Sequence, residues 1–270
     1  MTMIKMTIEL LMRPALRFSA NNSSILNLLK KDKVNTGDIL IKNFSLEVEA
    51  NTILSIMGES GIGKTTLLRV IAGLESNYRG TTMLNGLPVT RPSRAIFLMS
   101  QDHGLLPWMT LIENIRFCRN PESSVFREMD LLRSLGLSHI QDQFPKTLSS
   151  GERARGALAC AIAANPEILL LDEPFKSLDS EWRRRVEDIL LSWTEQSKTP
   201  TAIILVTHLA EEAIYIGDKV LLLSGSPLAI SSVEDTAEFR DRNSFNLKDL
   251  ASKINARFGE IIAPLHDYRI

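Results

Sequence analysis

The residues of this chain most clearly suited to chemistry form a glycine-rich segment. It reads Gly-Glu-Ser-Gly-Ile-Gly-Lys-Thr over residues 58–65 and fits the phosphate-binding pattern G-x-x-x-x-G-K-[ST]. An apolar run at 53–57 precedes it and a helical pattern follows it. Glycines let backbone N–H groups turn toward phosphate oxygens, and a helix N-terminus adds its positive dipole end. The segment therefore predicts a nucleoside triphosphate site.

The residues of this loop have different predicted roles. Lys64 is expected to reach the β- and γ-phosphates, and the Thr65 hydroxyl is expected to bind Mg²⁺. The residues expected to contact the nucleotide are Gly58, Glu59, Ser60, Gly61, Ile62, Gly63, Lys64, Thr65 and Thr66. The alternative is a glycine-rich turn with a chance Lys-Thr pair, which leaves the flanking strand and helix patterns unexplained.

Two carboxylates follow a second apolar run. Residues 168–171 are Ile-Leu-Leu-Leu, which is typical of a central parallel strand covered on both faces, and Asp172 and Glu173 come next. We expect Asp172 to hold Mg²⁺ directly or through water. Glu173 should point the other way and act as general base on an attacking water. Such a pair is often only the start of a solvated loop, but downstream of a phosphate loop it predicts hydrolysis.

A third segment makes the pattern specific to one family. Residues 148–152 read Leu-Ser-Ser-Gly-Glu and lead into an Ala-rich helical pattern. This resembles the L-S-G-G-Q signature of the ATP-binding cassette (ABC) ATPases. Three further elements stand in the family's order, namely a Q-loop glutamine, a D-loop aspartate and a switch histidine. They are Gln101, Asp179 and His208. The resemblance covers roughly residues 25–225.

The resemblance implies the catalytic and metal-binding residues. Glu173, His208 and Gln101 would be catalytic, with His208 hydrogen-bonding the γ-phosphate and orienting the water. Thr65, Gln101 and Asp172 would bind Mg²⁺. Considered alone, His208 would more often be a core histidine, but its place after the apolar run at 202–205 favours the switch role.

The resemblance also implies a partner. Ser149 and Gly151 would bind the γ-phosphate of ATP held by the opposite subunit, because a helix N-terminus there suits an anion. Asp179 would link the two sites across the dimer. One cassette would then hold two half-sites, and hydrolysis would require a second ABC cassette, most simply in a homodimer.

Two departures from the family pattern bear on nucleotide binding. The signature has Ser150 where glycine is usual and Glu152 where glutamine is usual, which places a Cβ atom and a negative charge near the expected phosphate. The stretch 30–38 lacks the aromatic residue that stacks on adenine in the family. Such stacking is worth about 1–3 kcal/mol, so we expect modest nucleotide affinity.

Composition excludes several classes of protein. The chain has 270 residues, 44% hydrophobic residues, two cysteines and a formal net charge of −1. This charge gives no basic field for nucleic acid, and two cysteines give no disulfide framework. No apolar run approaches ~18 residues, and residues 1–22 lack the order of a signal peptide. These features are consistent with the resemblance, which implies a peripheral protein on the cytoplasmic face of the cell membrane.

The expected fold class is an α/β P-loop cassette with a mostly parallel sheet, an antiparallel β portion and an inserted helical subdomain at about 103–160. We expect an N-terminal extension at 1–24, which is either an overlong start or an ordered arm, a cassette at 25–230 and a tail at 231–270. The tail should carry a short amphipathic helix, and the three arginines at 183–185 should form a solvated helix face. Positions expected at helical spacing in the cores of these parts are Phe126, Met129, Leu132, Leu135, Trp182, Val186, Ile189, Leu190, Trp193, Leu247, Leu250, Ala251, Ile254 and Phe258.

The segment after Gln101 indicates a subfamily. Residues 103–110 read His-Gly-Leu-Leu-Pro-Trp-Met-Thr, which is similar to ABC importers of nitrate, sulfonates and taurine and of thiamine pyrimidine precursors. The resemblance implies an ATPase subunit that energises uptake through a separate membrane permease, with a periplasmic or extracellular solute-binding protein as indirect partner. Trp108 would contact the permease, or else this segment fills the subdomain core. The alternatives are a non-transport ABC ATPase and a hydrolysis-weak cassette with a regulatory or assembly role.

Overall fold

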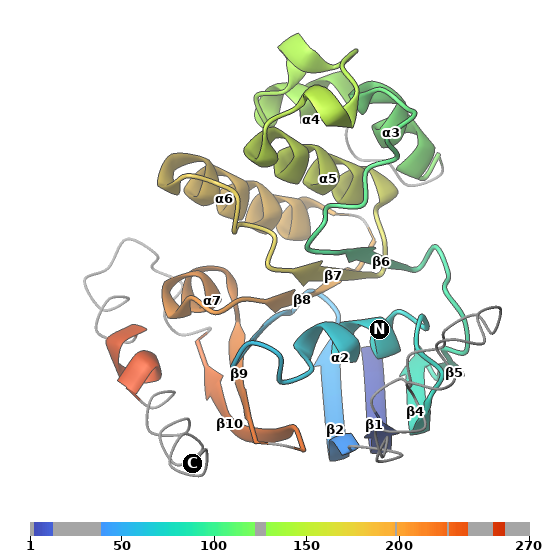
Figure 1. Ribbon diagram of the computed structural model, residues 1–270, viewed down its shortest axis with the longest axis vertical. Coiled ribbons are helices and arrows are strands. Elements are labelled where there is room, and N and C mark those ends of the chain that lie inside the picture. The colour runs from blue at the N-terminus through green and yellow to red at the C-terminus, as the bar shows by residue number, and fades with distance from the viewer. Residues whose placement is uncertain are drawn as a thin grey trace, which may run out of the picture.

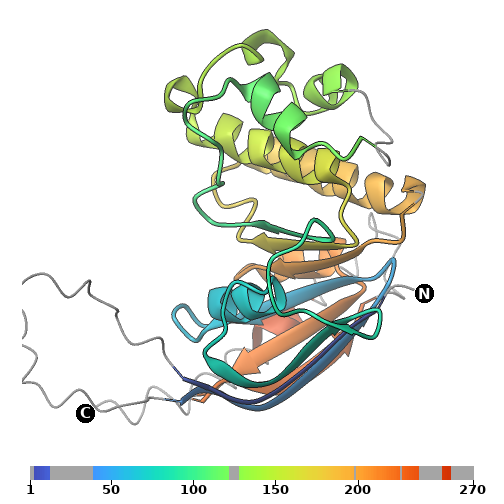
Figure 2. The same ribbon diagram turned by 90° about the vertical axis from the view of Figure 1, so that its right-hand side faces the viewer.

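The computed structural model of this chain has two β-sheets and a helical layer (Figure 1). It describes residues 3–12, 39–121, 128–197, 199–225, 227–236 and 251–256. The helical layer covers one face of the larger sheet, and the smaller sheet lies on the other side of that sheet (Figure 2). This arrangement confirms the predicted α/β class with its antiparallel portion.

The larger sheet is mostly parallel and positions the site. Its strand order is β10-β9-β3-β8-β7-β6, and the β9–β10 pair is antiparallel while the other pairs are parallel. The strands are β3 (Ile53–Gly58), β6 (Ile96–Met99), β7 (Ile168–Asp172), β8 (Ala202–Val206), β9 (Lys219–Ser224) and β10 (Ala229–Asp235). Every residue of β3, β7 and β8 is buried, as their apolar runs predict. Because these strands are parallel, the residues after their carboxyl ends gather at one edge.

The smaller sheet is antiparallel, in the order β2-β1-β4-β5. Its strands are β1 (Met3–Met12), β2 (Ile39–Glu49), β4 (Tyr78–Leu84) and β5 (Leu87–Pro88). In β1, Ile4 pairs with both Val48 and Leu84, and its side chain is buried. Residues 3–12 are therefore an interior strand of the fold. The predicted boundary between an extension at 1–24 and a cassette at 25–230 stays a prediction, while residues 3–12 pair with strands on both sides.

Helix α2 (Lys64–Ile71) packs between the two sheets (Figure 2). Leu67, Leu68, Val70 and Ile71 lie in one core with side chains from both sheets. The chain enters the helix through Gly63, whose φ of 117° is a conformation that residues with a Cβ rarely adopt. The phosphate loop is thereby held between a buried strand and a buried helix.

The helical layer contains most of the predicted subdomain. Its elements are α3 (Leu111–Cys118), α4 (Glu128–Ser134), α5 (Ser150–Ala164) and α6 (Ser180–Gln196), with short 3₁₀ turns at Ser138–Ile140 and Pro145–Thr147. Leu132 and Leu135 are buried as predicted, Met129 is exposed, and Phe126 lies outside the described residues. A Cβ at Gly156 would come within 2.7 Å of Leu111 Cδ1, so this glycine allows α3 and α5 to pack closely.

Helix α6 contains the three arginines that are expected to form a solvated face. Val186, Leu190 and Trp193 are buried and Trp182 and Ile189 are partly buried, as predicted. The three arginines are not a simple solvated face. Arg183 forms an ion pair with Glu212, Arg184 lies over the Tyr215 ring, and Arg185 lies 5.0 Å from the Trp182 ring centroid. Arg183 and Arg184 have these partners because α7 (Ala210–Ile216) packs beside α6.

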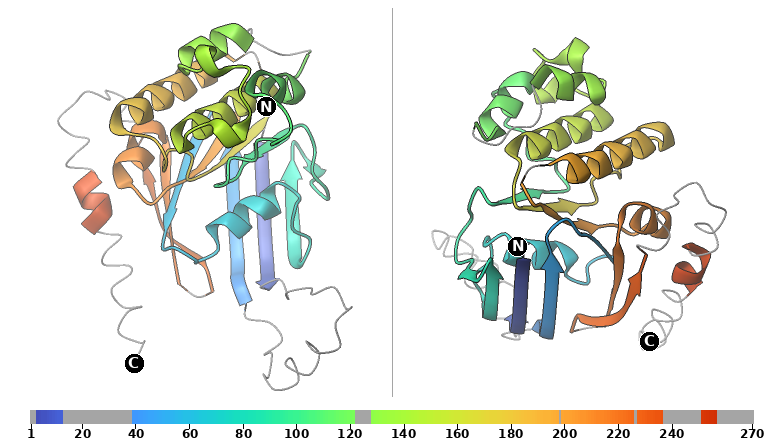
Figure 3. Two further views of the ribbon diagram at one scale, coloured as in Figure 1. Left: turned by 45° about the horizontal axis from the view of Figure 1, so that its top comes forward. Right: turned by 180° about the vertical axis from the view of Figure 1, so that it is seen from behind.

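The tail contributes a helical segment at 251–256, which lies beside α7 and β9 (Figure 3). Ala251 and Ile254 are buried in a cluster with Met57 and Ile214, so this part of the predicted amphipathic helix docks on the domain. Leu247, Leu250 and Phe258 lie outside the described residues. No helix in the described part of the chain is long and apolar enough to cross a membrane.

Candidate nucleotide-hydrolysis site

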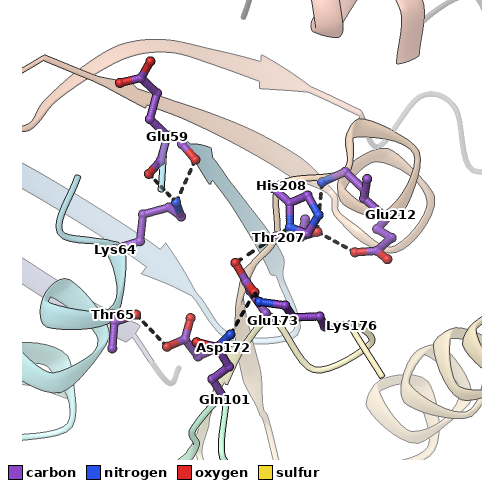
Figure 4. Close-up of polar contacts among 12 residues, drawn as sticks. Glu59, Lys64, Thr65, Gln101, Asp172, Glu173, Lys176, Thr207, His208 and Glu212 are labelled. Carbon is purple, nitrogen blue, oxygen red and sulfur yellow. Dashed lines mark hydrogen bonds and ion pairs between the residues drawn. The ribbon is translucent and has the colours of Figure 1, made fainter. Parts of the chain in front are cut away.

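The phosphate loop has the backbone shape that its sequence predicts. It runs from the end of β3 at Gly58 to the start of α2 at Lys64, and Gly61 and Gly63 both have positive φ. The ammonium group of Lys64 donates hydrogen bonds of 2.7 Å to the backbone carbonyls of Gly58 and Glu59 (Figure 4). The lysine thus folds back over the loop, where its charge faces the concave side.

Lys64 is a buried cation, with 7% of its surface exposed. Burial lowers the pKa of its ammonium group, whereas the carboxylates of Glu173, Asp172 and Glu59 raise it. Its hydrogen-bond partners, Gly58 and Glu59, offer neutral carbonyl oxygens. A cation desolvated in this way favours a bound anion, so the loop fits the triphosphate of a nucleotide.

Thr65 and Asp172 place two oxygen atoms together beside the loop. Thr65 Oγ1 donates a 2.7 Å hydrogen bond to Asp172 Oδ2 at the end of β7. Burial raises the pKa of the Asp172 carboxyl, the Thr65 hydrogen bond lowers it, and the charge of Glu173 raises it further. Mg²⁺ prefers oxygen ligands and binds through one or two carboxylates together with substrate phosphates. A hydroxyl and a buried carboxylate at this position fit that preference.

Glu173 projects away from Asp172, toward a polar cluster (Figure 4). Its φ is 50°, a left-handed conformation that costs of order 1–3 kcal/mol in a residue other than glycine. The carboxylate accepts hydrogen bonds from Lys176 Nζ at 2.9 Å and Gln101 Nε2 at 3.4 Å, and its Oε1 lies 3.7 Å from His208 Nδ1. Segments that follow β6, β7 and β8 therefore bring the three sequence-predicted catalytic residues together.

The signature residues lie elsewhere, at the start of α5 in the helical layer, whereas the phosphate loop lies beside α2 (Figure 1). Ser149 is the N-cap of α5, and a Cβ at Gly151 would lie 3.2 Å from the carbonyl of Ser177 in the D-loop segment. Asp179 is the N-cap of α6 and accepts a 2.9 Å hydrogen bond from Trp182 N. Ser149 and Asp179 are exposed, so the predicted half-site for a partner's ATP lies on the surface.

The unusual signature residue Glu152 interacts directly with Ser149. Its carboxylate accepts hydrogen bonds of 2.7 Å from both the backbone N–H and the hydroxyl of Ser149. The Ser149 hydroxyl in turn faces Glu152 N at 3.3 Å, which completes a capping box. These hydrogen bonds are the main reason that the pKa of Glu152 is lowered. The negative charge that the sequence predicts near the signature therefore lies against the backbone N–H and the hydroxyl of Ser149.

Sequence reasoning missed three residues of this site. Lys176 pairs with Glu173, and Thr207 and Glu212 contact each other behind His208. A cavity of about 130 Å³ is lined by Glu173, Lys176, Arg183, Thr207, His208, Leu209 and Glu212. The available signal was spacing, because Glu212 lies one helical turn after His208 in the sequence.

The interval between β1 and β2 is longer than the stretch 30–38, in which an adenine-stacking aromatic residue is expected by resemblance and is absent. It spans 13–38 and so contains Phe18 as well as the stretch 30–38. This interval lies outside the described residues, and the predicted lack of an aromatic residue remains a prediction.

A phosphate loop, strand-end carboxylates and an inserted helical layer arranged around one mostly parallel sheet define a P-loop ATPase of the cassette type. The model of the ABC transporter family matches residues 41–176. The chain belongs to this family. It is an ATP-binding subunit whose ATPase activity is coupled to transport.

Curated relatives cover most of the chain. The aliphatic sulfonates import ATP-binding protein SsuB 2 of Burkholderia lata is 36% identical over 228 residues, covering 82% of each chain. The SsuB protein of Bacillus cereus is 32% identical and covers 83% of this chain and 90% of its own. An uncharacterized ABC transporter ATP-binding protein of Methanocaldococcus jannaschii is 35% identical, covering 79% and 82%.

Solved structures confirm the fold. A bacterial ABC transporter cassette solved as a dimer aligns with a TM-score of 0.69 at 23% identity, over 86% of this chain and 98% of that chain. A post-hydrolysis cassette structure with ADP and Pi aligns with a TM-score of 0.68 at 22% identity, with the same coverage.

Proposed function

We propose that this chain is the ATPase subunit of an importer for a small sulfonate-like anion, working as a pair of cassettes on the cytoplasmic face of the membrane. Relatives at 32–38% identity are aliphatic sulfonates import ATP-binding proteins, and this likeness supports the solute class. The segment at 103–110 supports the same subfamily, which also includes importers of nitrate, taurine and thiamine precursors.

The orientation of Glu173 carries the proposal. Its left-handed backbone separates its carboxylate from Asp172 and directs it to Gln101 and His208. Glu173 takes the proton of the attacking water as general base, while His208 orients that water and hydrogen-bonds the γ-phosphate. Lys176 Nζ donates a 2.9 Å hydrogen bond to the same carboxylate and fixes its position.

Thr65 and Asp172 would hold Mg²⁺, with the side-chain oxygen of Gln101 as a further ligand. Mg²⁺ held there would supply positive charge against the charge that develops on the phosphates. Lys64 exchanges its two carbonyl partners for the β- and γ-phosphates. The glycines of the loop supply backbone N–H groups to the same oxygens.

The dimer follows from where the signature lies. Ser149, Gly151 and Asp179 are on the surface of the helical layer and D-loop, apart from this chain's own phosphate loop (Figure 1). A second cassette would bring its bound ATP to Ser149 and Gly151, and Asp179 would reach across to the partner's site. ATP then closes the pair and hydrolysis reopens it.

The permease contact is assigned to Trp108. Its side chain is 69% exposed, and Phe117 on α3 is 66% exposed. Buried Asn114 fixes the loop in front of Trp108 through hydrogen bonds with the backbone N–H and carbonyl of Leu106, while Leu105 packs against the core. An exposed tryptophan on a fixed loop suits a docked helix of the membrane permease, and this supports the proposed permease contact. A solute-binding protein delivers the anion on the other side of the membrane.

A hydrolysis-weak cassette with a regulatory or assembly role is the second candidate. The observation that favours it is the Glu152 carboxylate on both Ser149 donors. Steady-state ATPase activity of the assembled complex separates the two candidates, because the importer requires turnover that rises with solute.

The proposed function is tested in proteoliposomes that contain this chain with its permease and solute-binding protein. Uptake of a labelled aliphatic sulfonate should require ATP on the side of the cassette and should stimulate ATP hydrolysis. Nitrate and a thiamine pyrimidine precursor serve as competitors. Uptake of one of these in place of the sulfonate would refute the solute class, and absence of any ATP-driven uptake would refute the importer.

A further inference from the structure

A buried carboxylate lies directly behind the switch histidine (Figure 4). Glu212 on α7 is 6% exposed, and its Oε2 accepts a short hydrogen bond from the hydroxyl of Thr207. Its other oxygen lies 3.2 Å from Arg183 Nε as an ion pair. Burial raises the pKa of Glu212, and the Thr207 hydrogen bond and the Arg183 charge lower it.

These contacts fix the backbone on both sides of His208. Thr207 is 1% exposed, and its N–H donates to the carbonyl of Ile56 in β3 at 3.1 Å. Its hydroxyl donates to Glu212 and accepts from Leu209 N at 3.1 Å. The His208 side chain is 51% exposed, so its position depends on the backbone that carries it.

The same carboxylate joins two segments that are distant in sequence. Arg183 lies in the first turn of α6, and its N–H donates at 2.9 Å to the carbonyl of Asp179, the D-loop residue that caps this helix. Arg183, Thr207 and Glu212 also line the cavity of about 130 Å³ that opens beside Glu173. The switch segment and the start of the D-loop helix are therefore bound through one side chain.

Stability does not account for this arrangement. Buried ion pairs are often no more stabilising than well-packed apolar residues, because desolvating two charges offsets their attraction. The charge of Glu173 also raises the pKa of Glu212. A second carboxylate is therefore an unfavourable neighbour for Glu212 if its role is only structural. A carboxylate at this position is better explained by the geometry that it imposes on the segments around His208 and Arg183.

We propose that Glu212 is a positioning residue for hydrolysis. Its hydrogen bond with Thr207 holds the backbone that places His208 beside Glu173. Its ion pair with Arg183 connects that backbone to the D-loop helix. This inference rests on the proposed role of His208. A misplacement of about 1 Å at a reacting centre can cost of order 10²-fold in rate, so the clamp should affect turnover more than nucleotide binding.

The test compares Thr207→Val, which keeps the shape of the side chain and removes the hydroxyl, with Thr207→Ser, which keeps the hydroxyl. The full-length chain is assayed for MgATP hydrolysis. Thr207→Val should lower kcat by about 10-fold or more and leave KM within about two-fold. Thr207→Ser should restore most of that loss. Equal kcat values for the valine variant and the wild type would overturn the proposal.

A second arm places Thr207→Val in a His208→Ala background. If the clamp acts through the histidine, the double variant should be no slower than His208→Ala alone. A further 10-fold loss in that background would overturn the proposal. Wild-type turnover by His208→Ala would instead refute the role proposed for His208, so the two failures are distinguishable. Should Thr207→Val not fold, Glu212→Gln replaces it in both arms, with a lower kcat expected only where His208 is present.

Discussion

The Glu187 carboxyl on α6 gives a stability prediction whose size follows from its surroundings. The residue is 3% exposed, its Oε2 lies 3.4 Å from Arg184 Nη1, and Glu212 is a like-charged neighbour. Burial is the main cause that raises the pKa of Glu187 from 4.5 to about 7, and the charge of Glu212 adds to it. Arg184 opposes both effects but is itself half-exposed.

The direction of the pH dependence follows from proton binding. Between pH 4.5 and about 7 the folded protein holds a proton on Glu187 that the unfolded chain has released. The unfolding free energy therefore falls as pH rises through this range, and the loss is complete above about pH 7. At ~1.4 kcal/mol for each tenfold change in proton affinity, a rise from 4.5 to about 7 corresponds to about 3 kcal/mol.

Glu187→Gln removes the charge and keeps the shape of the side chain. Below pH 5 the variant should be about as stable as the wild type, because both side chains are then neutral. At pH 8 it should be more stable by about 3 kcal/mol, because the rise of the Glu187 pKa to about 7 already includes the opposing charge of Arg184. Urea unfolding at pH 5 and pH 8 measures the difference.

Glu195→Gln on the exposed side of the same helix is the matched control, and it should change the unfolding free energy by less than about 0.5 kcal/mol at both pH values. A pH-independent effect of Glu187→Gln would refute the reasoning. So would a destabilised variant at pH 8, because the arginines would then stabilise the ionised carboxylate.

Three further variants test the proposed mechanism. Glu173→Gln should retain ATP binding, lower turnover by a factor of order 10² or more and trap an ATP-dependent dimer on gel filtration; normal turnover would remove Glu173 from the mechanism. Glu152→Gln preserves the capping box but removes the charge on Ser149, so in the Glu173→Gln background the dimer should form at lower ATP concentration. A need for more ATP would mean that the carboxylate assists closure. Trp108→Ala should leave melting temperature and nucleotide affinity unchanged and abolish co-purification with the permease, whereas a collapse in melting temperature would show a structural role.

The phosphate loop and the strand-end carboxylates could be predicted from sequence because their physics is local. A glycine pattern between an apolar strand and a helix fixes the position of Lys64, and four apolar residues before Asp172 fix a buried parallel strand. Gln101 and His208 follow from the family order of motifs. That parallel strands deliver all of them to one edge is a general property of such sheets.

The missed features depend on contacts between segments that are distant in sequence. Nothing local shows that residues 3–12 pair between β2 and β4, because the pairing partners follow at least 27 residues later, the shortest separation being Met12 to Ile39. Arg183 looks like one of three solvated charges until α7 places Glu212 beside it. For Arg183 and for residues 3–12 the residue types were visible and their partners were not. Glu152 is the exception, because Ser149-x-x-Glu152 is a local capping-box pattern whose partner lies only three residues away.

The groups that the mechanism assigns to phosphate already have partners within the chain. Lys64 donates hydrogen bonds to two loop carbonyls, and the Ser149 hydroxyl donates to Glu152. Nucleotide contacts at these groups replace internal hydrogen bonds, so each contributes only the difference between two bonds, a net of order 1 kcal/mol. The affinity of a single cassette for nucleotide should therefore be modest. Under the proposed mechanism, stronger binding would come from closure, when a second cassette would supply Ser149 and Gly151 to the same phosphate, and tight nucleotide binding would then depend on the dimer.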